Sequence, residues 1–265
     1  MKKSERACII MQILTENPNK DYPLGYFAEL LKCAKSSVSE DIKLIRSAMD
    51  DAGYGYVETT SGSRGGVRYV PYISEDRAIE VLTRIRTMLE EPDRQLGGGF
   101  LYTSDIMFSP ELSKGAAEIF AKHFASTEAD LVITVETKGI PVAAFTAELL
   151  HLPLVVIRRE SRISDGSTVS INFFSGSSDR LQKMSLAKRA VSPGTRAIII
   201  DDYMHGGGSI KGIEDMLSEF GARSAGVGVM IAAGKEWLEE SSERYPLILM
   251  TETGSGARFE INPRL

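Results

Sequence analysis

The sequence has few of the features that mark disulfide-rich, metal-binding or membrane proteins. Its 265 residues include two cysteines, Cys8 and Cys33, which follow no metal-ligand spacing and form no disulfide framework. No apolar run approaches the roughly 20 residues of a membrane span, and no signal peptide opens the chain. We therefore expect a cytoplasmic protein with no membrane partner and no metal site of its own.

What is present is typical of a globular protein. Hydrophobic residues make up 43% of the chain and charged residues 25%, and the length suits two domains better than one. The net charge of −5 is unevenly spread, since residues 1–74 hold ten Lys and Arg against nine Asp and Glu, and the remainder holds 21 against 27. This charge asymmetry is mild, and it gains meaning only from the motifs described below.

The first 52 residues contain three stretches with the apolar spacing of amphipathic helices. Ser4 is expected to cap the first helix, and Asn17-Pro18 to end it. Pro23 precedes the second helix, and Ser37-Val38-Ser39-Glu40, which has the form of a capping box, opens the third. The residues expected to face inward are Ala7, Ile10, Met11 and Leu14, then Leu24, Phe27, Ala28 and Leu31, then Val38, Ile42, Ile45 and Met49.

A β-hairpin is predicted after these helices. Tyr56–Thr60 and Val67–Pro71 have strand composition, and they flank a glycine- and serine-rich tip that contains Arg64. Three helices with a tight turn before the third, followed by a hairpin, describe a winged-helix domain over residues 1–74.

The polar residues of this domain fit DNA binding. A recognition helix presents its early residues to the major groove, and a basic hairpin and N-terminus can reach the phosphate backbone. The alternative is a small helical domain that joins subunits, but a tip of Gly, Ser and Arg offers little to an apolar partner. The expected DNA contacts are Lys2, Lys3, Arg6, Lys35, Ser36, Ser37, Ser39, Lys43, Arg64 and Arg68.

A connecting helix is predicted over residues 74–95. Its apolar stripe consists of Ala78, Ile79, Leu82, Ile85 and Leu89, and Glu91-Pro92 should end it. The stripe fits docking onto the second domain or, in addition, a contact in a dimer. The spacing alone does not separate the two.

The stretch Ala197–Gly212 carries the chemistry of the second domain. Ala197–Ile200 is a buried strand in pattern, Asp201 and Asp202 stand where it should end, and Gly206–Gly208 lead to Ser209, a plausible N-cap of the next helix. The carboxylates can accept hydrogen bonds from ribose hydroxyls. The glycines and the helix N-terminus favour a phosphate, so this stretch indicates a site for a phosphorylated sugar. Gly221 should end the helix.

The same stretch resembles the phosphoribosyl pyrophosphate (PRPP) signature of type I phosphoribosyltransferases. Gly206 and Ser209 stand where those enzymes usually carry threonines. The resemblance implies that the strand Leu131–Val135 is followed by a pyrophosphate loop, with Thr137, Lys138 and Gly139, before a helix from Pro141 to Leu150. After a further strand, Leu154–Ile157, residues 158–170 resemble the long flexible loop that closes over PRPP.

Taken together, these segments resemble the bacterial purine-operon repressor family over nearly the whole chain. They include KSSVSEDI (35–42), SGSRGGVRYVP (61–71), GGGFLYTSDI (97–106), TVETKGIP (134–141), GSTVSINFFSGSSDRLQKMSLAKR (166–189) and IIIDDYMHGGGSI (198–210). The resemblance implies an α/β fold: a winged helix over 1–74, then over 75–265 a linker helix and a type I phosphoribosyltransferase-like domain, with a mainly parallel sheet flanked by helices.

The function implied by this resemblance is regulation. The family consists of dimeric DNA-binding regulators of purine synthesis genes, in which PRPP is an effector that weakens DNA binding. A Lys is common in the family near position 205, where this chain has His205. The residues expected at the effector are Tyr102, Thr137, Lys138, Gly139, Asp201, Asp202, His205, Gly206, Gly207, Gly208 and Ser209.

An active purine phosphoribosyltransferase with an accessory N-terminal domain is the alternative. That reaction needs PRPP-bound Mg²⁺, a closing loop and a pocket for the base. The sequence contains no recognisable base-binding hood and lacks the first Thr of the phosphate loop, so we expect no catalytic residues, no required cofactor and no turnover, with Mg²⁺ arriving alongside PRPP. A nucleotide messenger that carries diphosphates would compete for the same site.

Overall fold

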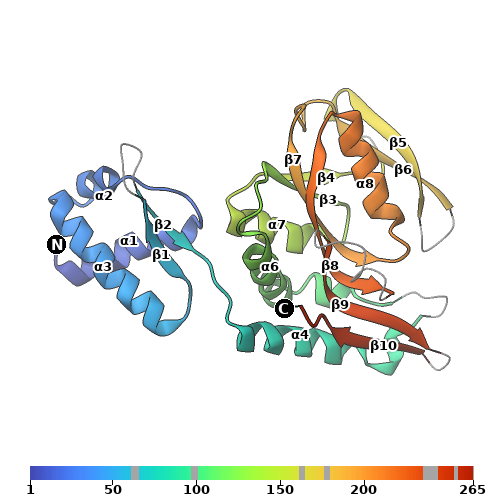
Figure 1. The fold of residues 1–265 in the computed structure, drawn as a ribbon, viewed down its shortest axis with the longest axis horizontal. Coiled ribbons are helices and arrows are strands. Elements are labelled where there is room, and N and C mark those ends of the chain that lie inside the picture. The colour runs from blue at the N-terminus through green and yellow to red at the C-terminus, as the bar shows by residue number, and fades with distance from the viewer. Residues whose placement is uncertain are drawn as a thin grey trace. The chain divides into compact units, whose positions relative to one another are not determined.

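The computed structural model describes residues 1–60, 66–96, 101–160, 165–175, 180–234, 244–253 and 256–264. The chain forms two compact units (Figure 1). Unit 1 comprises Met1–Ser74 with Glu148–His151, and unit 2 comprises Glu75–Ala147 with Leu152–Leu265. The two units are described separately below.

Unit 1 is a winged helix. Its elements are α1 (Lys3–Glu16), α2 (Leu24–Leu30), α3 (Lys35–Ala52), β1 (Tyr56–Thr59) and β2 (Val67–Val70). The strands pair antiparallel, with Tyr56 opposite Val70, and α1 and α2 pack against α3. The core consists of Ile10, Leu14, Tyr22, Phe27, Leu31, Val38, Ile42, Ile45, Val57 and Val67. The predicted apolar faces of all three helices contribute to this core.

Two of the three predicted helix starts in unit 1 are wrong by about one turn or less, and the third is confirmed because α2 begins directly after Pro23. α1 begins at Lys3, and the backbone N–H of Lys2 donates to Glu5 Oε2 at 2.8 Å, so Ser4 lies inside the helix. α3 begins at Lys35 after an extended Ala34, which places Ser37 in the first turn instead of at the cap. Helical backbone therefore starts before the serines, although serine is the better capping residue.

Unit 2 is built on a mainly parallel, six-stranded sheet with the order β10-β9-β8-β7-β3-β4. All neighbours pair in parallel except β9 and β10, which pair antiparallel. The strands are β3 (Leu131–Val135), β4 (Leu154–Ile157), β7 (Arg196–Met204), β8 (Arg223–Ala233), β9 (Arg244–Thr253) and β10 (Gly256–Ile261). β3 and β4 have the predicted limits.

Helices cover both faces of this sheet, as expected for a phosphoribosyltransferase-like domain. On β8, a Cβ at Gly228 would come within 2.8 Å of Phe120 in α6, so this position faces α6 (Pro110–Phe124). The next position, Val229, belongs to the core that α8 (Gly208–Glu219) shares through Ile213. Alternate residues of a strand point to opposite faces, so α6 and α8 lie on opposite sides of the sheet. The remaining helices are α4 (Glu75–Leu89), η1 (Pro92–Arg94), α5 (Ser104–Met107) and α7 (Ile140–Leu150).

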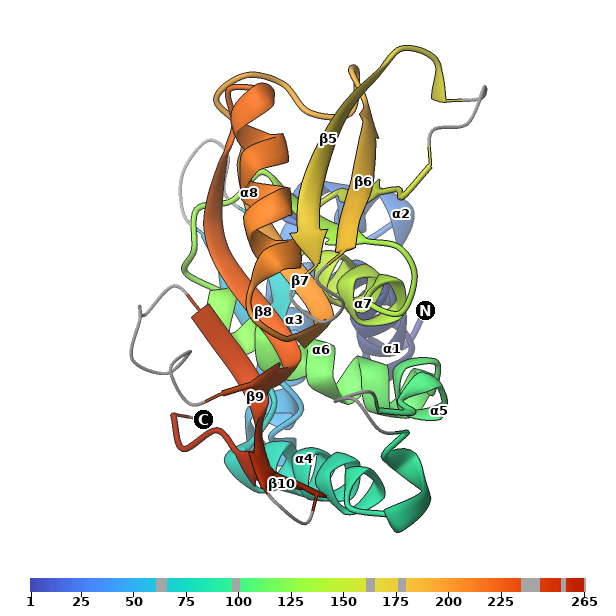
Figure 2. The ribbon, with the colours of Figure 1, turned by 90° about the vertical axis from the view of Figure 1, so that its right-hand side faces the viewer.

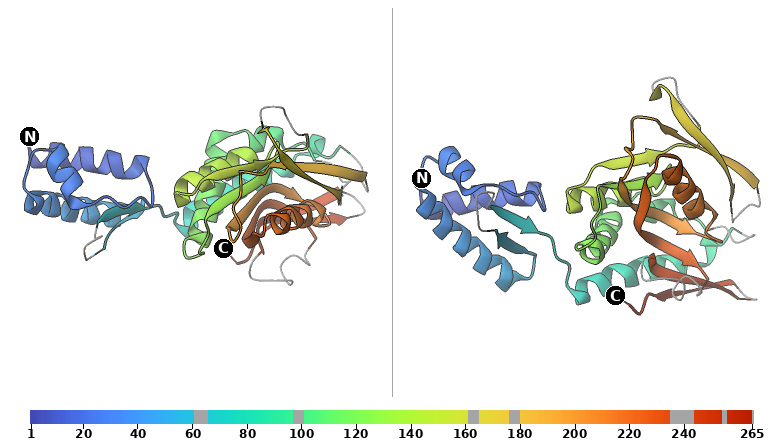
Figure 3. Two further views of the ribbon diagram at one scale, coloured as in Figure 1. Left: turned by 90° about the horizontal axis from the view of Figure 1, so that it is seen from above. Right: turned by 45° about the horizontal axis from the view of Figure 1, so that its top comes forward.

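A separate hairpin lies beside α8 (Figures 2 and 3). It consists of β5 (Thr168–Ser175) and β6 (Arg180–Ala187), and Phe173 and Met184 pack closely against Gly212 of α8. The predicted flexible loop over 158–170 is therefore wrong at its end, because Thr168–Ser170 are strand residues paired with β6. Residues 161–164 of that loop lie outside the described part of the chain.

The predicted connecting helix is α4, which belongs to unit 2 and packs against α6, β9 and β10. Ala78, Leu82, Ile85 and Leu89 are buried, but Ile79 is 50% exposed, so the predicted stripe is wrong at this position. The helix ends at Leu89, two residues before the predicted Glu91. Docking within unit 2 is thus observed, and the dimer contact stays a prediction.

Candidate functional site

The candidate site lies where three adjacent parallel strands end. Val135 on β3 is opposite Ile157 on β4, and β3 also pairs with β7. Three segments therefore meet at one edge of the sheet: the loop Glu136–Gly139 after β3, the pair Arg158-Arg159 after β4, and the last part of β7 from Asp201 onward. In open α/β sheets, ligands bind in the crevice at this carboxyl edge.

Asp201 and Asp202 form the acidic centre of the site. They lie within β7, which pairs with β8 as far as Met204, so the strand does not end before them as predicted. Asp201 is buried, and its Oδ1 accepts the backbone N–H of Asp202 at 3.0 Å. Burial and the neighbouring Asp202 raise the pKa of Asp201 well above its ordinary value. Burial also raises the pKa of Asp202, against the opposing charges of Lys138 and Arg159.

The loop Glu136–Gly139 approaches this pair closely. A Cβ at Gly139 would lie 2.7 Å from Thr134 Oγ1 and 3.0 Å from Asp201 Oδ1, so only glycine fits there without movement. The peptide bond between Glu136 and Thr137 is cis. Thr134 Oγ1 is buried, and no described residue hydrogen-bonds to it. The loop and β7 thus meet without an intervening side chain.

Two cations stand beside the acidic pair. Lys138 donates from Nζ to Thr103 Oγ1 at 3.2 Å. Arg159 donates its backbone N–H to Glu136 Oε1 at 2.7 Å, and its Nη1 to Gln182 Oε1 on β6 at 3.1 Å. The site therefore combines carboxyl oxygens, which can accept hydrogen bonds from sugar hydroxyls, with positive groups, which can bind phosphate. A sugar phosphate requires both.

The glycine turn after β7 leads directly into a helix. Gly206 and Gly207 have φ of +64° and +69°, which favours glycine at both positions. Gly207 is the N-cap and α8 begins at Gly208, so Ser209 is in the first turn and the predicted serine cap is wrong. The free N–H groups of this helix start attract anions. Gly221, with φ of +65°, follows the last turn as predicted.

Tyr102 and His205 occupy the margins of the site. The Tyr102 side chain is 47% exposed, and its ring centroid lies 5.9 Å from the Arg94 guanidinium carbon. His205 lies parallel to Tyr203, with ring centroids 6.5 Å apart. Whether either residue contacts a ligand stays a prediction.

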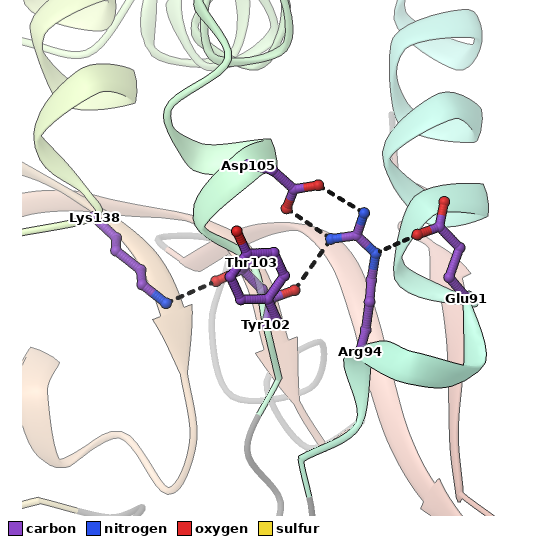
Figure 4. Close-up of polar contacts among 6 residues, drawn as sticks. All are labelled: Glu91, Arg94, Tyr102, Thr103, Asp105 and Lys138. Carbon is purple, nitrogen blue, oxygen red and sulfur yellow. Dashed lines mark hydrogen bonds and ion pairs between the residues drawn. The ribbon is translucent and has the colours of Figure 1, made fainter.

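Sequence reasoning missed several groups at the site. Figure 4 shows Thr103 against Lys138, and Arg94 against Glu91, Tyr102 and Asp105. Thr134 was also missed, although a polar residue within a buried strand was a usable signal. No local pattern marks Arg94, because its main partner is eleven residues away.

The expected DNA contacts of unit 1 divide into exposed and internally bonded residues. Lys35 and Lys43 are exposed on α3, with Ser36 also exposed and Ser37 and Ser39 half-buried. Lys2 and Lys3 are exposed at the N-terminal end of α1. Arg64 lies outside the described residues. These positions remain predicted DNA contacts.

Arg6 and Arg68 bond to carboxylates of unit 1. Arg6 donates to both oxygens of the buried Asp41, at 2.7 and 3.0 Å, which joins α1 to α3 and raises the pKa of Arg6. Arg68 donates to Glu58 on the opposite strand of the hairpin, at 2.7 and 2.9 Å. Any contact of these two arginines with DNA must therefore compete with, or share, these bonds.

Comparison with known proteins assigns both parts of the chain. A family described as "Bacterial purine repressor, N-terminal" matches residues 2–71, and one described as "Phosphoribosyl transferase domain" matches residues 103–255. A probable purine biosynthesis transcriptional regulator of Streptococcus pneumoniae serotype 4 is 40% identical over 252 residues, which cover 95% of this chain and 92% of the relative. The chain belongs to the bacterial purine repressor family.

Other comparisons agree with this family. The purine biosynthesis transcriptional repressor of Bacillus subtilis is 41% identical over 232 residues, covering 88% of this chain and 81% of the relative. The crystal structure of adenine phosphoribosyltransferase from Thermoanaerobacter pseudethanolicus superposes with a TM-score of 0.55 at 19% identity, and covers 63% of this chain and 99% of that one. This second likeness shows the fold of unit 2.

None of the helices in the described ranges is long and apolar enough to cross a membrane. Within those same ranges, no three His, Cys, Asp or Glu side chains gather as a metal site would require.

Proposed function

We propose that this chain is a DNA-binding transcriptional regulator, a repressor of purine biosynthesis genes, and that PRPP is an effector that weakens its binding to DNA. The observation that carries the proposal is the presence of a winged helix and a sugar-phosphate site in one chain. Membership of the purine repressor family supports the regulatory role, because the relatives over most of the chain are named as regulators of purine biosynthesis.

The site geometry supports PRPP as the ligand. Asp201 and Asp202 accept the ribose hydroxyls, and the start of α8, with Gly206–Ser209, receives the 5′-phosphate. Lys138 and the backbone of the loop Glu136–Gly139 hold the diphosphate. Mg²⁺ binds proteins through one or two carboxylates together with substrate phosphates, so the two aspartates suit a Mg²⁺ ion that arrives with PRPP and neutralises its phosphates.

The proposal excludes turnover. Gly206 replaces a threonine of the enzymes' phosphate loop, and the relatives are named as regulators. The alternative function, a purine phosphoribosyltransferase, is tested by incubating the protein with PRPP, Mg²⁺ and each purine base. We expect no nucleotide to form, and steady production at about 1 s⁻¹ or faster would establish the enzyme instead.

The proposed partner is double-stranded DNA from the control regions of purine genes, bound by a cytoplasmic homodimer. PRPP can weaken this binding only through its different affinity for the free and DNA-bound protein. It either changes the spacing of the two recognition helices in the dimer or, being polyanionic, competes with DNA for a basic surface beside the site, where Arg158 and Arg159 lie. A nucleotide messenger with diphosphates would compete with PRPP.

The decisive variant is Asp201→Ala combined with Asp202→Ala. It removes the ribose acceptors and leaves unit 1 unaltered, so we expect normal DNA affinity that no longer responds to PRPP. Because hydrogen bonds to charged groups contribute about 1.5–3 kcal/mol each, PRPP affinity should fall by more than about 100-fold. A variant that releases DNA at the wild-type PRPP concentration would place the effector site elsewhere.

A further inference from the structure

The Arg94 side chain is buried and held on nearly all sides. It is 8% exposed and lies in η1, outside the sheet edge that carries the aspartates. Nη1 and Nη2 donate to the two oxygens of Asp105, each at 2.7 Å, Nε donates to Glu91 at 2.9 Å, and Nη1 also donates to the Tyr102 carbonyl at 3.2 Å (Figure 4). Four of the five N–H groups of the guanidinium are thus used.

These bonds fix the segment Leu101–Met107. The N-terminal end of the segment is fixed by two contacts. The Tyr102 N–H donates to the Arg94 carbonyl at 2.9 Å, and Gln95 and Leu101 form an antiparallel bridge. Its exit is held by Asp105, whose pKa the hydrogen bonds from Arg94 keep below the ordinary value. Arg94 therefore holds the residue before Thr103 through its carbonyl, and the residue two positions after Thr103 through its carboxylate.

Thr103 connects this arrangement to the effector site. Its side chain is 4% exposed, and its Oγ1 accepts a hydrogen bond from Lys138 Nζ at 3.2 Å. Lys138 is the basic side chain of the loop Glu136–Gly139, and its charge acts on Asp202. A bonded path thus runs from Arg94 through Tyr102 and Asp105 to Thr103, and from Thr103 to Lys138.

We propose that Arg94 is a positioning residue, which acts through Tyr102, Asp105 and Thr103 to hold the Lys138 ammonium group where a diphosphate binds. The inference rests on the proposed function, in which Lys138 holds the diphosphate of PRPP. A lysine has a long, flexible stem, and a binding site loses affinity when that stem must be ordered only on binding. Arginine suits the anchoring role because its planar fork matches a carboxylate at two points, which lysine cannot do.

The test measures PRPP affinity by calorimetry, with Mg²⁺, on the full chain. Arg94→Met keeps the apolar stem and removes the fork, and Thr103→Val removes only the last hydrogen bond before Lys138. Each should weaken PRPP binding about tenfold, the order expected when one long side chain must be immobilised on binding. If Arg94→Met does not fold, Asp105→Asn and Thr103→Val carry the test, because both preserve side-chain size.

Arg196→Met is the matched control. Arg196 also bonds to two carboxylates, those of Glu128 and Asp130, but it lies at the opposite end of β7 from Asp201. Its loss should leave PRPP affinity unchanged. All variants should keep the wild-type circular dichroism spectrum and the wild-type DNA affinity in the absence of PRPP.

A double-mutant cycle with Lys138→Met separates positioning from a general structural effect. If Arg94 acts through Lys138, adding Arg94→Met to Lys138→Met should weaken PRPP binding by less than about twofold. Two results would overturn the positioning role alone. One is a double variant whose loss of PRPP affinity equals the product of the losses in the two single variants, and the other is an Arg94→Met variant that binds PRPP as tightly as wild type. Wild-type protein that binds neither PRPP nor pyrophosphate would overturn the proposed function, and this inference with it.

Discussion

Each of the two units contains a buried aspartate, but the groups that surround the carboxyl group differ between them. In unit 1, Asp41 is fully buried and accepts two hydrogen bonds from the Arg6 guanidinium. In unit 2, Asp201 is buried beside a second carboxyl group, Asp202, and within the described residues neither forms an ion pair with Lys or Arg. The first arrangement satisfies its charge inside the fold, whereas the second keeps the pKa of both carboxyl groups raised.

This difference distinguishes a carboxylate that stabilises the fold from carboxyl groups that form a ligand-binding site. A buried carboxylate that an arginine pairs at two points joins two helices and needs nothing further. Two adjacent carboxyl groups at the carboxyl edge of a parallel sheet, with raised pKa values and cations nearby, are typical of places where a ligand completes the electrostatics.

The largest effect on stability should come from the core of unit 1. Ile42 is 2% exposed on α3, and Ile42→Ala should reduce the free energy of unfolding of this unit by about 2–5 kcal/mol because it leaves a cavity. Leu44→Ala, on the exposed side of the same helix, should change it by less than about 0.5 kcal/mol. Equal losses in denaturant titrations would contradict the assigned core.

A smaller effect is expected at Gly139. Gly139→Ala forces a methyl group against Thr134 and Asp201, and overpacking of this kind costs about 1–3 kcal/mol. PRPP affinity should fall along with the melting temperature. In unit 1, Gly25→Ala meets only the Lys35 side chain at an ordinary 3.5 Å, so it should be neutral or stabilising. Calorimetry of PRPP binding and thermal melting compare the two.

At neutral pH, Asp41→Asn and Asp201→Asn should change the melting temperature in opposite directions. Asp41→Asn replaces the buried carboxylate that accepts both hydrogen bonds from Arg6 with a weaker acceptor, so it should lower the melting temperature. Asp201→Asn removes a carboxyl group whose charge burial and Asp202 disfavour, while its side-chain oxygen still accepts the Asp202 N–H, so the free protein should melt higher.

The pH dependence of the Asp201 effect follows from its raised pKa. The folded protein keeps the Asp201 proton to a higher pH than the unfolded chain, so wild-type stability falls as pH rises above the unfolded pKa of about 3.9. The advantage of Asp201→Asn should therefore be greatest at neutral pH and disappear below about pH 4. A constant advantage across that range would show that the pKa of Asp201 is not raised.

The smallest effects concern DNA binding by single cations. Lys35→Ala and Lys43→Ala should each reduce the slope of log affinity against log salt concentration by about 0.9, if each lysine contacts one phosphate. Arg68→Ala should reduce it by less, because Glu58 already pairs with Arg68. An unchanged slope for both lysines would remove α3 from the interface.

The sequence predicted the elements that short-range patterns determine. The apolar runs over Leu131–Val135 and Leu154–Ile157 are strands with the predicted limits, and the inward faces of the first three helices form a core as expected. The family resemblance also predicted the parallel sheet and its flanking helices. For the two strands and the three helix faces, the signal lies within a few residues of the element itself.

Features that depend on distant neighbours were not predictable in the same way. Capping residues differ by only about 1 kcal/mol, so a helix can begin a turn before its best serine. β7 continues through Asp201 and Asp202 because β8 pairs with it to Met204. Arg94 and Asp105 come together only because the segment between them folds back on itself, and no spacing rule anticipates that pair.

The central claim is that PRPP bound in unit 2 weakens the DNA binding of unit 1. It is tested most directly by fluorescence anisotropy of labelled purine-gene control DNA with the full-length protein, at fixed salt and Mg²⁺, with and without PRPP. We expect saturating PRPP to weaken DNA affinity by about 5–150-fold, the usual range of coupling between two sites. DNA affinity that is unchanged at PRPP concentrations shown by calorimetry to saturate the protein would contradict it.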